Sequence, residues 1–165
     1  MSTPGPARAL LPARGFTLME LLVTLALLAL VALLAAPMAE LTVRRSQEQV
    51  LRQALREIRT ALDQYKAAAE QGLIERKVGD SGYPPDLETL AKGVTNQKSP
   101  GHEPMYFLRS VPRNPFGAAQ GPASASWGLR SYASPPQSPA PGADVFDVYC
   151  ESAAVGLNGQ PYREW

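Results

Sequence analysis

The sequence predicts an α+β protein in which a long N-terminal helix, apolar at its start, is followed by a small C-terminal antiparallel β-sheet. Three observations predict this fold. Residues 21–39 contain no charged side chain, and apolar residues then recur at three- and four-residue steps to about residue 71. Two segments near the C-terminus alternate between bulky and small or polar side chains, as strands do. The 165 residues are enough for one modest domain behind such a helix.

Residues 1–15 precede the expected helix as a leader. Arg8 and Arg14 give it a basic character, and it contains three prolines. We therefore expect it to lie outside the fold.

We expect a transmembrane helix at residues 16–39. Its apolar run at residues 21–39 is long enough to cross a hydrocarbon layer of about 30 Å. Glu20 stands at its head, and an ionisable residue in a membrane segment is by default a functional hypothesis. Three simpler interpretations remain open. The first is a cleaved secretory signal, although the run is longer than usual and Pro37 follows a plausible cleavage point. The others are a plain membrane anchor with Glu20 at the interface and a buried helix of a soluble protein.

The helix is expected to run on through residues 40–72 as an amphipathic segment that enters the head. Pro37 should kink it or melt it locally, and Gly72 should end it. Its apolar face is formed by Leu51, Leu55, Ile58, Leu62, Tyr65 and Ala69. The charged residues beside that face are interpreted as solvated; they are Arg52, Arg56, Arg59, Asp63 and Lys66.

Residues 73–165 are expected to form a globular α+β head. A short helix is predicted at residues 86–92, with acids early, Lys92 late and Gly93 at its end. Residues 105–111 fit either a helix or a strand, and the prolines of residues 112–117 predict a turn-rich connector.

Strands are predicted at residues 127–132 and 145–150. In the second strand, Val145, Asp147 and Tyr149 should share one face, opposite Phe146, Val148 and Cys150. A turn at residues 156–159 leads to residues 161–165, which fit a short third strand.

The composition favours neither an enzyme nor a nucleic-acid-binding protein. Sixteen Lys and Arg against fifteen Asp and Glu give a formal net charge of +1, and no nucleophile motif or phosphate-binding glycine loop is present. His102 has no Cys or acidic partner at metal-ligand spacing, so it is expected to be a solvated loop residue. Cys150 is the single cysteine, which excludes an intrachain disulfide, and we expect it to be buried.

The segment Gly15-Phe16-Thr17-Leu18-Met19-Glu20 resembles the cleavage and methylation signal of type IV pilins and of the pseudopilins of type II secretion. The resemblance implies that a prepilin peptidase cuts between Gly15 and Phe16 and N-methylates Phe16. Glu20 is then the fifth residue of the mature chain and corresponds to the assembly glutamate. Pro37 matches a proline that is common in the helix of this family.

The resemblance also implies a location and partners. The chain would be a single-pass inner-membrane protein with its head in the periplasm. Its partners would be the prepilin peptidase, further copies of itself in a helical homopolymer, minor pseudopilins and the inner-membrane secretion platform. Within the polymer, Glu20 would neutralise the Phe16 amine of a neighbour, because charges in a low dielectric are tolerated only as a pair.

Three later segments, Tyr83-Pro84 and residues 111–117 and 162–165, resemble the major pseudopilin of type II secretion or a close relative. The alternative function is a type IV pilus subunit, major or minor, used in adhesion, motility or DNA uptake. The lone Cys150 argues against that alternative, because such pilins often close a C-terminal loop with a disulfide.

Members of the pseudopilin family often bind calcium in a carboxylate-rich loop after the last main strand. Here residues 151–160 contain no Asp, whereas calcium takes about six to eight oxygen ligands, several of them from carboxylates. We therefore expect no metal cofactor, and Glu151 and Asn158 are only weak calcium candidates.

Overall fold

The computed structural model describes residues 15–165, except for the side chains of residues 34–37. The chain divides into two units, Met1–Thr42 and Val43–Trp165, and each is described by itself. The elements in chain order are α1 (Leu18–Glu70), α2 (Leu87–Lys92), β1 (Val94–Thr95), β2 (Pro104–Met105), the 3-10 helix η1 (Ser124–Ser126), β3 (Gly128–Arg130), β4 (Asp147–Tyr149) and the 3-10 helix η2 (Tyr162–Glu164). The predicted α+β fold class is confirmed: a long N-terminal helix precedes small antiparallel sheets.

In the first unit, α1 begins at Leu18 and is helical to the end of the unit at Thr42. The backbone is also helical at position 37. The side chain of Pro37 lies outside the described residues, so the kink there stays a prediction.

In the second unit, α1 supplies the main buried face of the head. The predicted apolar face is confirmed: Leu51, Leu55, Ile58, Leu62, Tyr65 and Ala69 are all buried. The helix ends as the sequence predicts, at Gly72, which has a φ of +67°. The Gly72 N–H bonds to the carbonyl of Ala69 at 3.1 Å and the Leu73 N–H to that of Ala68 at 2.9 Å, which is the pairing that closes many helix ends.

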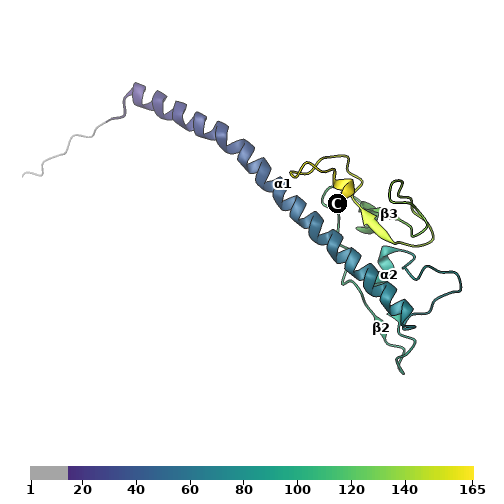
Figure 1. Ribbon diagram of the computed structural model, residues 1–165. Helices are drawn as coiled ribbons and strands as arrows, with labels where there is room; N and C mark the ends of the chain where they lie inside the picture. Colours follow the sequence, from purple (N-terminus) through teal and green to yellow (C-terminus); the bar gives the residue numbers. More distant parts are fainter. Residues whose placement is uncertain (1–14) are drawn as a thin grey trace, which may run out of the picture. The chain divides into compact units, whose positions relative to one another are not determined.

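The remaining elements of the head lie beside this part of α1 (Figure 1). The predicted short helix is present as α2, which Asp86 caps by accepting a hydrogen bond from the Thr89 N–H at 2.7 Å. Leu87 and Leu90 of α2 are buried in the same core cluster as Ile58 of α1. The strands β1 and β2 form an antiparallel pair in which Val94 lies opposite Met105.

The strands predicted at residues 127–132 and 145–150 exist in shortened form as β3 and β4, paired antiparallel with Leu129 opposite Val148. Gly128 is required by close packing, because a Cβ at this position would collide with the ring of Tyr149. Val148 and Cys150, which were expected to share one face, are both fully buried. Val145 is also buried, contrary to the predicted faces, because it precedes the strand and donates its N–H to the carbonyl of Pro84.

The structure corrects two further expectations. The predicted third strand is wrong: the chain makes an isolated bridge between Val155 and Pro161 and then turns into η2. Residues 105–111, left open between helix and strand, contribute only Met105 to β2, and the rest is irregular. Two separate two-stranded sheets therefore replace one sheet of two or three strands.

Candidate assembly site

The start of α1 is fixed by Thr17. Its hydroxyl oxygen Oγ1 accepts a hydrogen bond from the Glu20 N–H at 3.2 Å, and its carbonyl accepts from the Leu21 N–H at 3.1 Å. These are the two bonds that an N-cap residue makes. Glu20 thus lies in the first helical turn, where the exposed N–H groups of the helix favour a negative charge.

The carboxylate of Glu20 is exposed, and no residue in the described range 15–165 makes an ion pair with it. It is also the only charged side chain in the sequence between Gly15 and Ala39. The structure therefore presents a single acid, with no ion-pair partner among the described residues, just before the uncharged run of α1 at residues 21–39.

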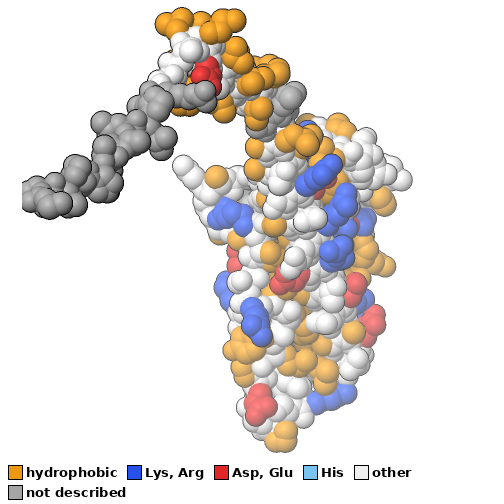
Figure 2. All heavy atoms as spheres, turned by 90° about the vertical axis from the view of Figure 1, so that its left-hand side faces the viewer, with side chains coloured by type: hydrophobic (Ala, Val, Ile, Leu, Met, Phe, Trp, Pro, Cys, Tyr) orange, Lys and Arg blue, Asp and Glu red, His pale blue; other side chains and the backbone are white. Residues whose placement is uncertain are grey.

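The helix around this acid presents an apolar surface (Figure 2). The described large apolar side chains from Phe16 to Leu41 have exposed fractions between 42% and 79%. By its length and composition α1 can cross a membrane. Such a surface needs a hydrocarbon layer or other apolar helices to cover it, because water does not solvate it favourably.

Gly15 lies just before the helix and is exposed. A Cβ added to it would meet no atom within 4 Å. The fold itself therefore does not require glycine at this position.

The weak calcium candidates, Glu151 and Asn158, are both exposed. The Asn158 side chain is used locally, since its Oδ1 accepts from the Gln160 N–H at 3.1 Å. Among the described residues, no group of three or more His, Cys, Asp and Glu is placed to bind a metal.

Two other predicted placements are confirmed. Cys150 is fully buried and reduced, with Asn114 Nδ2 donating to its sulfur at 3.3 Å. His102 is an exposed loop residue.

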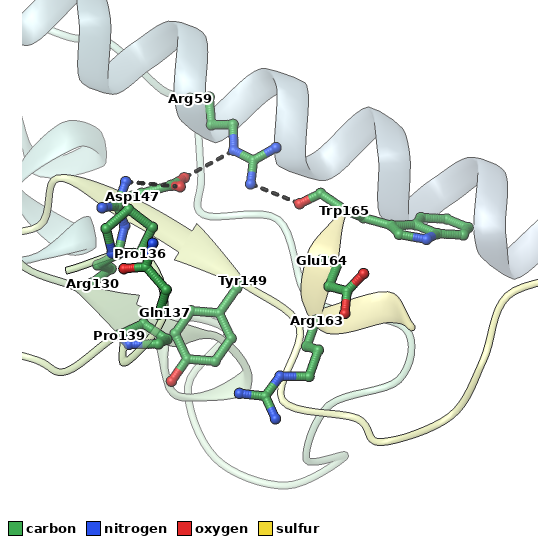
Figure 3. A pocket seen from close by; sticks show the side chains of 10 residues that line it. All are labelled: Arg59, Arg130, Pro136, Gln137, Pro139, Asp147, Tyr149, Arg163, Glu164 and Trp165. Atoms are coloured by element: carbon green, nitrogen blue, oxygen red, sulfur yellow. Dashed lines mark hydrogen bonds and ion pairs between the residues drawn. The ribbon is translucent and has the colours of Figure 1, made fainter. Parts of the chain in front are cut away.

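The interpretation of the charged residues along α1 as a solvated face is wrong for Arg59 and Lys66. Arg59 Nε bonds to Asp147 Oδ1 at 2.9 Å, and Arg59 Nη2 donates to the Trp165 carbonyl at 2.8 Å (Figure 3). Lys66 Nζ donates to the Ser81 carbonyl at 2.7 Å. These cations tie the later segments of the head to the helix.

A surface hollow of about 600 Å³ lies beside Arg59. Arg130 also approaches Asp147, at 3.6 Å, so the central charges of the hollow pair with one another. This pairing indicates a structural role.

Sequence reasoning also missed Glu48, a carboxylate that is only 5% exposed. Its Oε1 accepts from the Tyr162 hydroxyl at 2.9 Å and from the Leu157 N–H at 2.7 Å. The nearby Arg44 donates a hydrogen bond from its Nε to the Tyr162 hydroxyl oxygen at 3.4 Å. This bond is the main cause of a raised pKa of the Arg44 guanidinium, and the charge of Glu48 raises that pKa further. The available signal was the position of an acid three residues before Leu51, on the apolar face of the helix.

Comparison with known families gives one match. Residues 12–36 match the family described as the prokaryotic N-terminal methylation motif, and these residues include Gly15, Phe16 and Glu20. Neither the curated proteins nor the solved structures contain a match to this chain.

The methylation motif, the long N-terminal helix and the small antiparallel sheets together indicate a type IV pilin-like protein. The motif implies processing by a prepilin peptidase and association with a membrane. The single long apolar helix fits a single-pass membrane anchor.

Proposed function

We propose that the chain is a structural subunit of a type II secretion pseudopilus. After a prepilin peptidase removes its leader, it polymerises from the inner membrane into a short periplasmic filament that helps to export folded proteins. The observation that supports this proposal is the exposed, unpaired carboxylate of Glu20, which lies within the methylation motif and precedes the uncharged run at residues 21–39.

In the proposed filament, the Glu20 carboxylate pairs with the N-methylated amine of Phe16 from a neighbouring copy. The apolar faces of α1 supply most of the contact area, and the ion pair sets the register between copies. The other partners are minor pseudopilins and the inner-membrane secretion platform. The role is structural, with no catalytic step and no cofactor.

A type IV pilus subunit is the alternative function. The buried, unpaired Cys150 supports the secretion subunit, because a pilin of the other kind often carries a C-terminal disulfide. Neighbouring genes for a secretion ATPase and an outer-membrane secretin would support the proposal. Genes for a retraction ATPase and a pilus tip would support the alternative.

The test is crosslinking between copies in membranes, compared for the wild type, Glu20→Ala and Glu20→Gln. Removing one partner of a buried ion pair leaves the other charge unpaired, which typically costs about 3–5 kcal/mol. Glu20→Ala should therefore abolish most crosslinking and secretion while membrane insertion and leader cleavage continue. Glu20→Gln keeps the shape and a weaker hydrogen bond, so its defect should be milder.

Glu40 provides the matched control, because it is an exposed acid at the other end of the same apolar run. Glu40→Ala should assemble as the wild type does. A plain anchor predicts that Glu20→Ala improves the span and harms nothing. Equal crosslinking and secretion in all these variants would therefore overturn the proposal.

A further inference from the structure

A small hollow on the surface of the head is lined by three arginines of α1. Arg52, Arg56 and Arg59 follow one another at four- and three-residue steps, so their side chains lie on one face of the helix. The hollow has a volume of about 260 Å³, and the residues that line it include no Asp or Glu. We call this hollow the arginine pocket.

One of these arginines is paired and two are not. Arg59 Nε bonds to Asp147 Oδ1 at 2.9 Å, and Arg59 Nη2 donates to the main-chain oxygen of Trp165 at 2.8 Å. Arg52 and Arg56 are exposed, and neither makes an ion pair with a residue in the described range 15–165. The pocket therefore has two guanidinium groups available for a ligand.

Two acids of α1 lie close to these guanidinium groups in the sequence, and neither neutralises them. Glu48 is one helical turn before Arg52, but it is only 5% exposed and accepts two hydrogen bonds of its own. Glu57 directly follows Arg56, and adjacent residues of a helix point in directions about 100° apart. Glu57 accordingly lines a different hollow.

The rest of the pocket comes mainly from the C-terminal segment. The guanidinium carbon of Arg52 lies 4.3 Å from the centroid of the Trp165 ring, and Figure 3 shows this indole beside α1. Asn158 Nδ2 donates to Gln160 Oε1 at 3.2 Å, and both amides line the pocket. An amide nitrogen carries two donors, so these side chains can also bond to the main chain of a ligand.

The groups of the pocket favour a ligand that supplies acceptors. The indole Nε1–H of Trp165 is buried and has no hydrogen-bond partner in the part of the chain that the structure describes, although buried donors are nearly always satisfied. Arginine carries five donors and no acceptor. An ionised carboxylate is an acceptor-only group, and it matches the planar fork of a guanidinium with two parallel hydrogen bonds.

The size and charge of the surface indicate the class of ligand. The volume lies below the roughly 300–1,000 Å³ of pockets that take drug-sized molecules. It therefore suits one side chain of a longer segment better than a whole small molecule. Nucleic acid is disfavoured, because its binding draws on an extended positive field, whereas the formal net charge of this chain is only +1.

We propose that the arginine pocket is a docking site for an acidic segment of a protein partner, with one carboxylate of the segment bound between Arg52 and Arg56. The face of the Trp165 ring attracts the guanidinium of Arg52 and holds it at the pocket. The inference goes beyond the proposed function, because all residues of the pocket belong to the unit Val43–Trp165. Docking there does not depend on the ion pair that joins copies in the proposed filament.

The test is a titration of the full chain, held in zwitterionic detergent micelles, with a peptide of six glutamates. The fluorescence of Trp165 reports binding, because a carboxylate that engages Arg52 changes the charge over the indole ring. Trp127 is only 4% exposed and supplies a constant background. A peptide of six glutamines is the uncharged control, and isothermal titration calorimetry measures the affinity independently of fluorescence.

Arg52→Gln and Arg56→Gln should each weaken the binding of the glutamate peptide several-fold, because each removes one of the two unpaired guanidinium groups. Arg76→Gln is the matched control, since Arg76 is an exposed arginine outside the pocket. It should bind the peptide as the wild type does. Added salt should weaken binding to the wild type, because exposed charges are screened.

The proposal is overturned if the glutamate peptide does not bind, or if Arg76→Gln weakens binding as much as Arg52→Gln does. In the second case the peptide responds only to total charge. Inorganic phosphate that binds as tightly as the peptide would make the pocket a general anion site and overturn the proposal too. Tighter binding of an oligonucleotide with six phosphates would assign the pocket to nucleic acid, again contradicting it. If the peptide dissociates self-associated chains in sedimentation, a second copy is the occupant and the proposal is wrong.

Discussion

At the scale of single residues, the processing site is set by the chemistry of recognition and not by the needs of the fold. Space is open around Gly15, and Thr17 caps α1 with its own hydroxyl oxygen. A larger side chain at Gly15 would thus displace no atom of the described fold. Any loss of processing in a variant then reports on the peptidase.

Co-expression with a prepilin peptidase should shorten the chain by its first 15 residues and leave one added methyl group on Phe16. Gly15→Ala should be processed more readily than Gly15→Leu, because a peptidase that approaches the backbone closely tolerates a methyl better than a branched side chain. Intact-mass measurement checks both statements. A new terminus near Ala36 or Ala39 would instead identify a conventional secretory signal.

The sequence pattern identified Glu20 as a candidate functional residue, but it did not indicate the role of Arg59. Glu20 is conspicuous in the sequence, because no other charge lies between Gly15 and Ala39. Arg59 has the spacing of a solvated residue, yet its partners Asp147 and Trp165 lie 88 and 106 positions away. Helical periodicity describes one element and carries no information about which distant backbone reaches it.

At the scale of elements, the C-terminal segment depends on α1 for its order. The segment from Val155 to Trp165 contains one isolated bridge and one 3-10 turn, so its backbone bonds are local and none of them reaches α1. The Glu48 carboxylate compensates with two hydrogen bonds, to Leu157 and Tyr162. A buried carboxylate is stable when such donors satisfy it.

Glu48→Ala should destabilise the fragment of residues 43–165, because it leaves the Leu157 N–H and the Tyr162 hydroxyl without their acceptor. Hydrogen bonds to a charged group contribute about 1.5–3 kcal/mol each, so we expect the Tm to fall by several degrees or more. The Tm of Glu48→Gln should fall less, because the amide keeps one acceptor oxygen. Thermal unfolding followed by circular dichroism measures both changes.

Glu57→Ala is the control for that experiment, since Glu57 is an exposed acid on the same helix. Its Tm should stay close to that of the wild type. A Glu48→Ala fragment as stable as the Glu57→Ala fragment would show that the two bonds do not order the C-terminal segment.

Elements made of local contacts could be predicted, and elements made of distant contacts could not. Both helices carry their own signals, such as the cap at Asp86 and the stops at Gly72 and Gly93. The β1–β2 pair has only two residues in each strand, which is too short for an alternating pattern. The prediction of a third strand was wrong because Pro161 leads into a 3-10 turn after a single bridge.

At the scale of the whole molecule, the two units differ in whether their apolar side chains are exposed or buried. The described large apolar side chains of the first unit are exposed, whereas the second unit buries a cluster built from α1, α2 and β4. The apolar run alone predicted the first behaviour. The second needed the packing of aromatic rings such as Tyr65 on Phe107, with centroids 5.4 Å apart, which a sequence pattern does not specify.

The same packing predicts how the head responds to alkali. Burial raises the pKa of Tyr65 above its usual value near 10, and the carboxylates of Asp80 and Asp86 raise it further. Burial likewise raises the pKa of Tyr83, with Asp63 as the next cause. The folded head therefore holds both phenolic protons more tightly than the unfolded chain does. This contribution to stability is complete below about pH 10 and is lost as the pH rises through the folded pKa values.

Denaturant unfolding of residues 43–165 from pH 8 to 11 should show a free energy of unfolding that declines above about pH 10. The part of this decline that comes from the two tyrosines is isolated by comparison with phenylalanine variants. Tyr65→Phe and Tyr83→Phe should each lose less stability between pH 9 and 11 than the wild type does, because a ring without a hydroxyl cannot ionise. Tyr106→Phe alters a tyrosine that is 63% exposed and should follow the wild-type curve. If all four proteins lose stability in parallel, the ionisation of Tyr65 and Tyr83 does not govern the alkaline unfolding of the head.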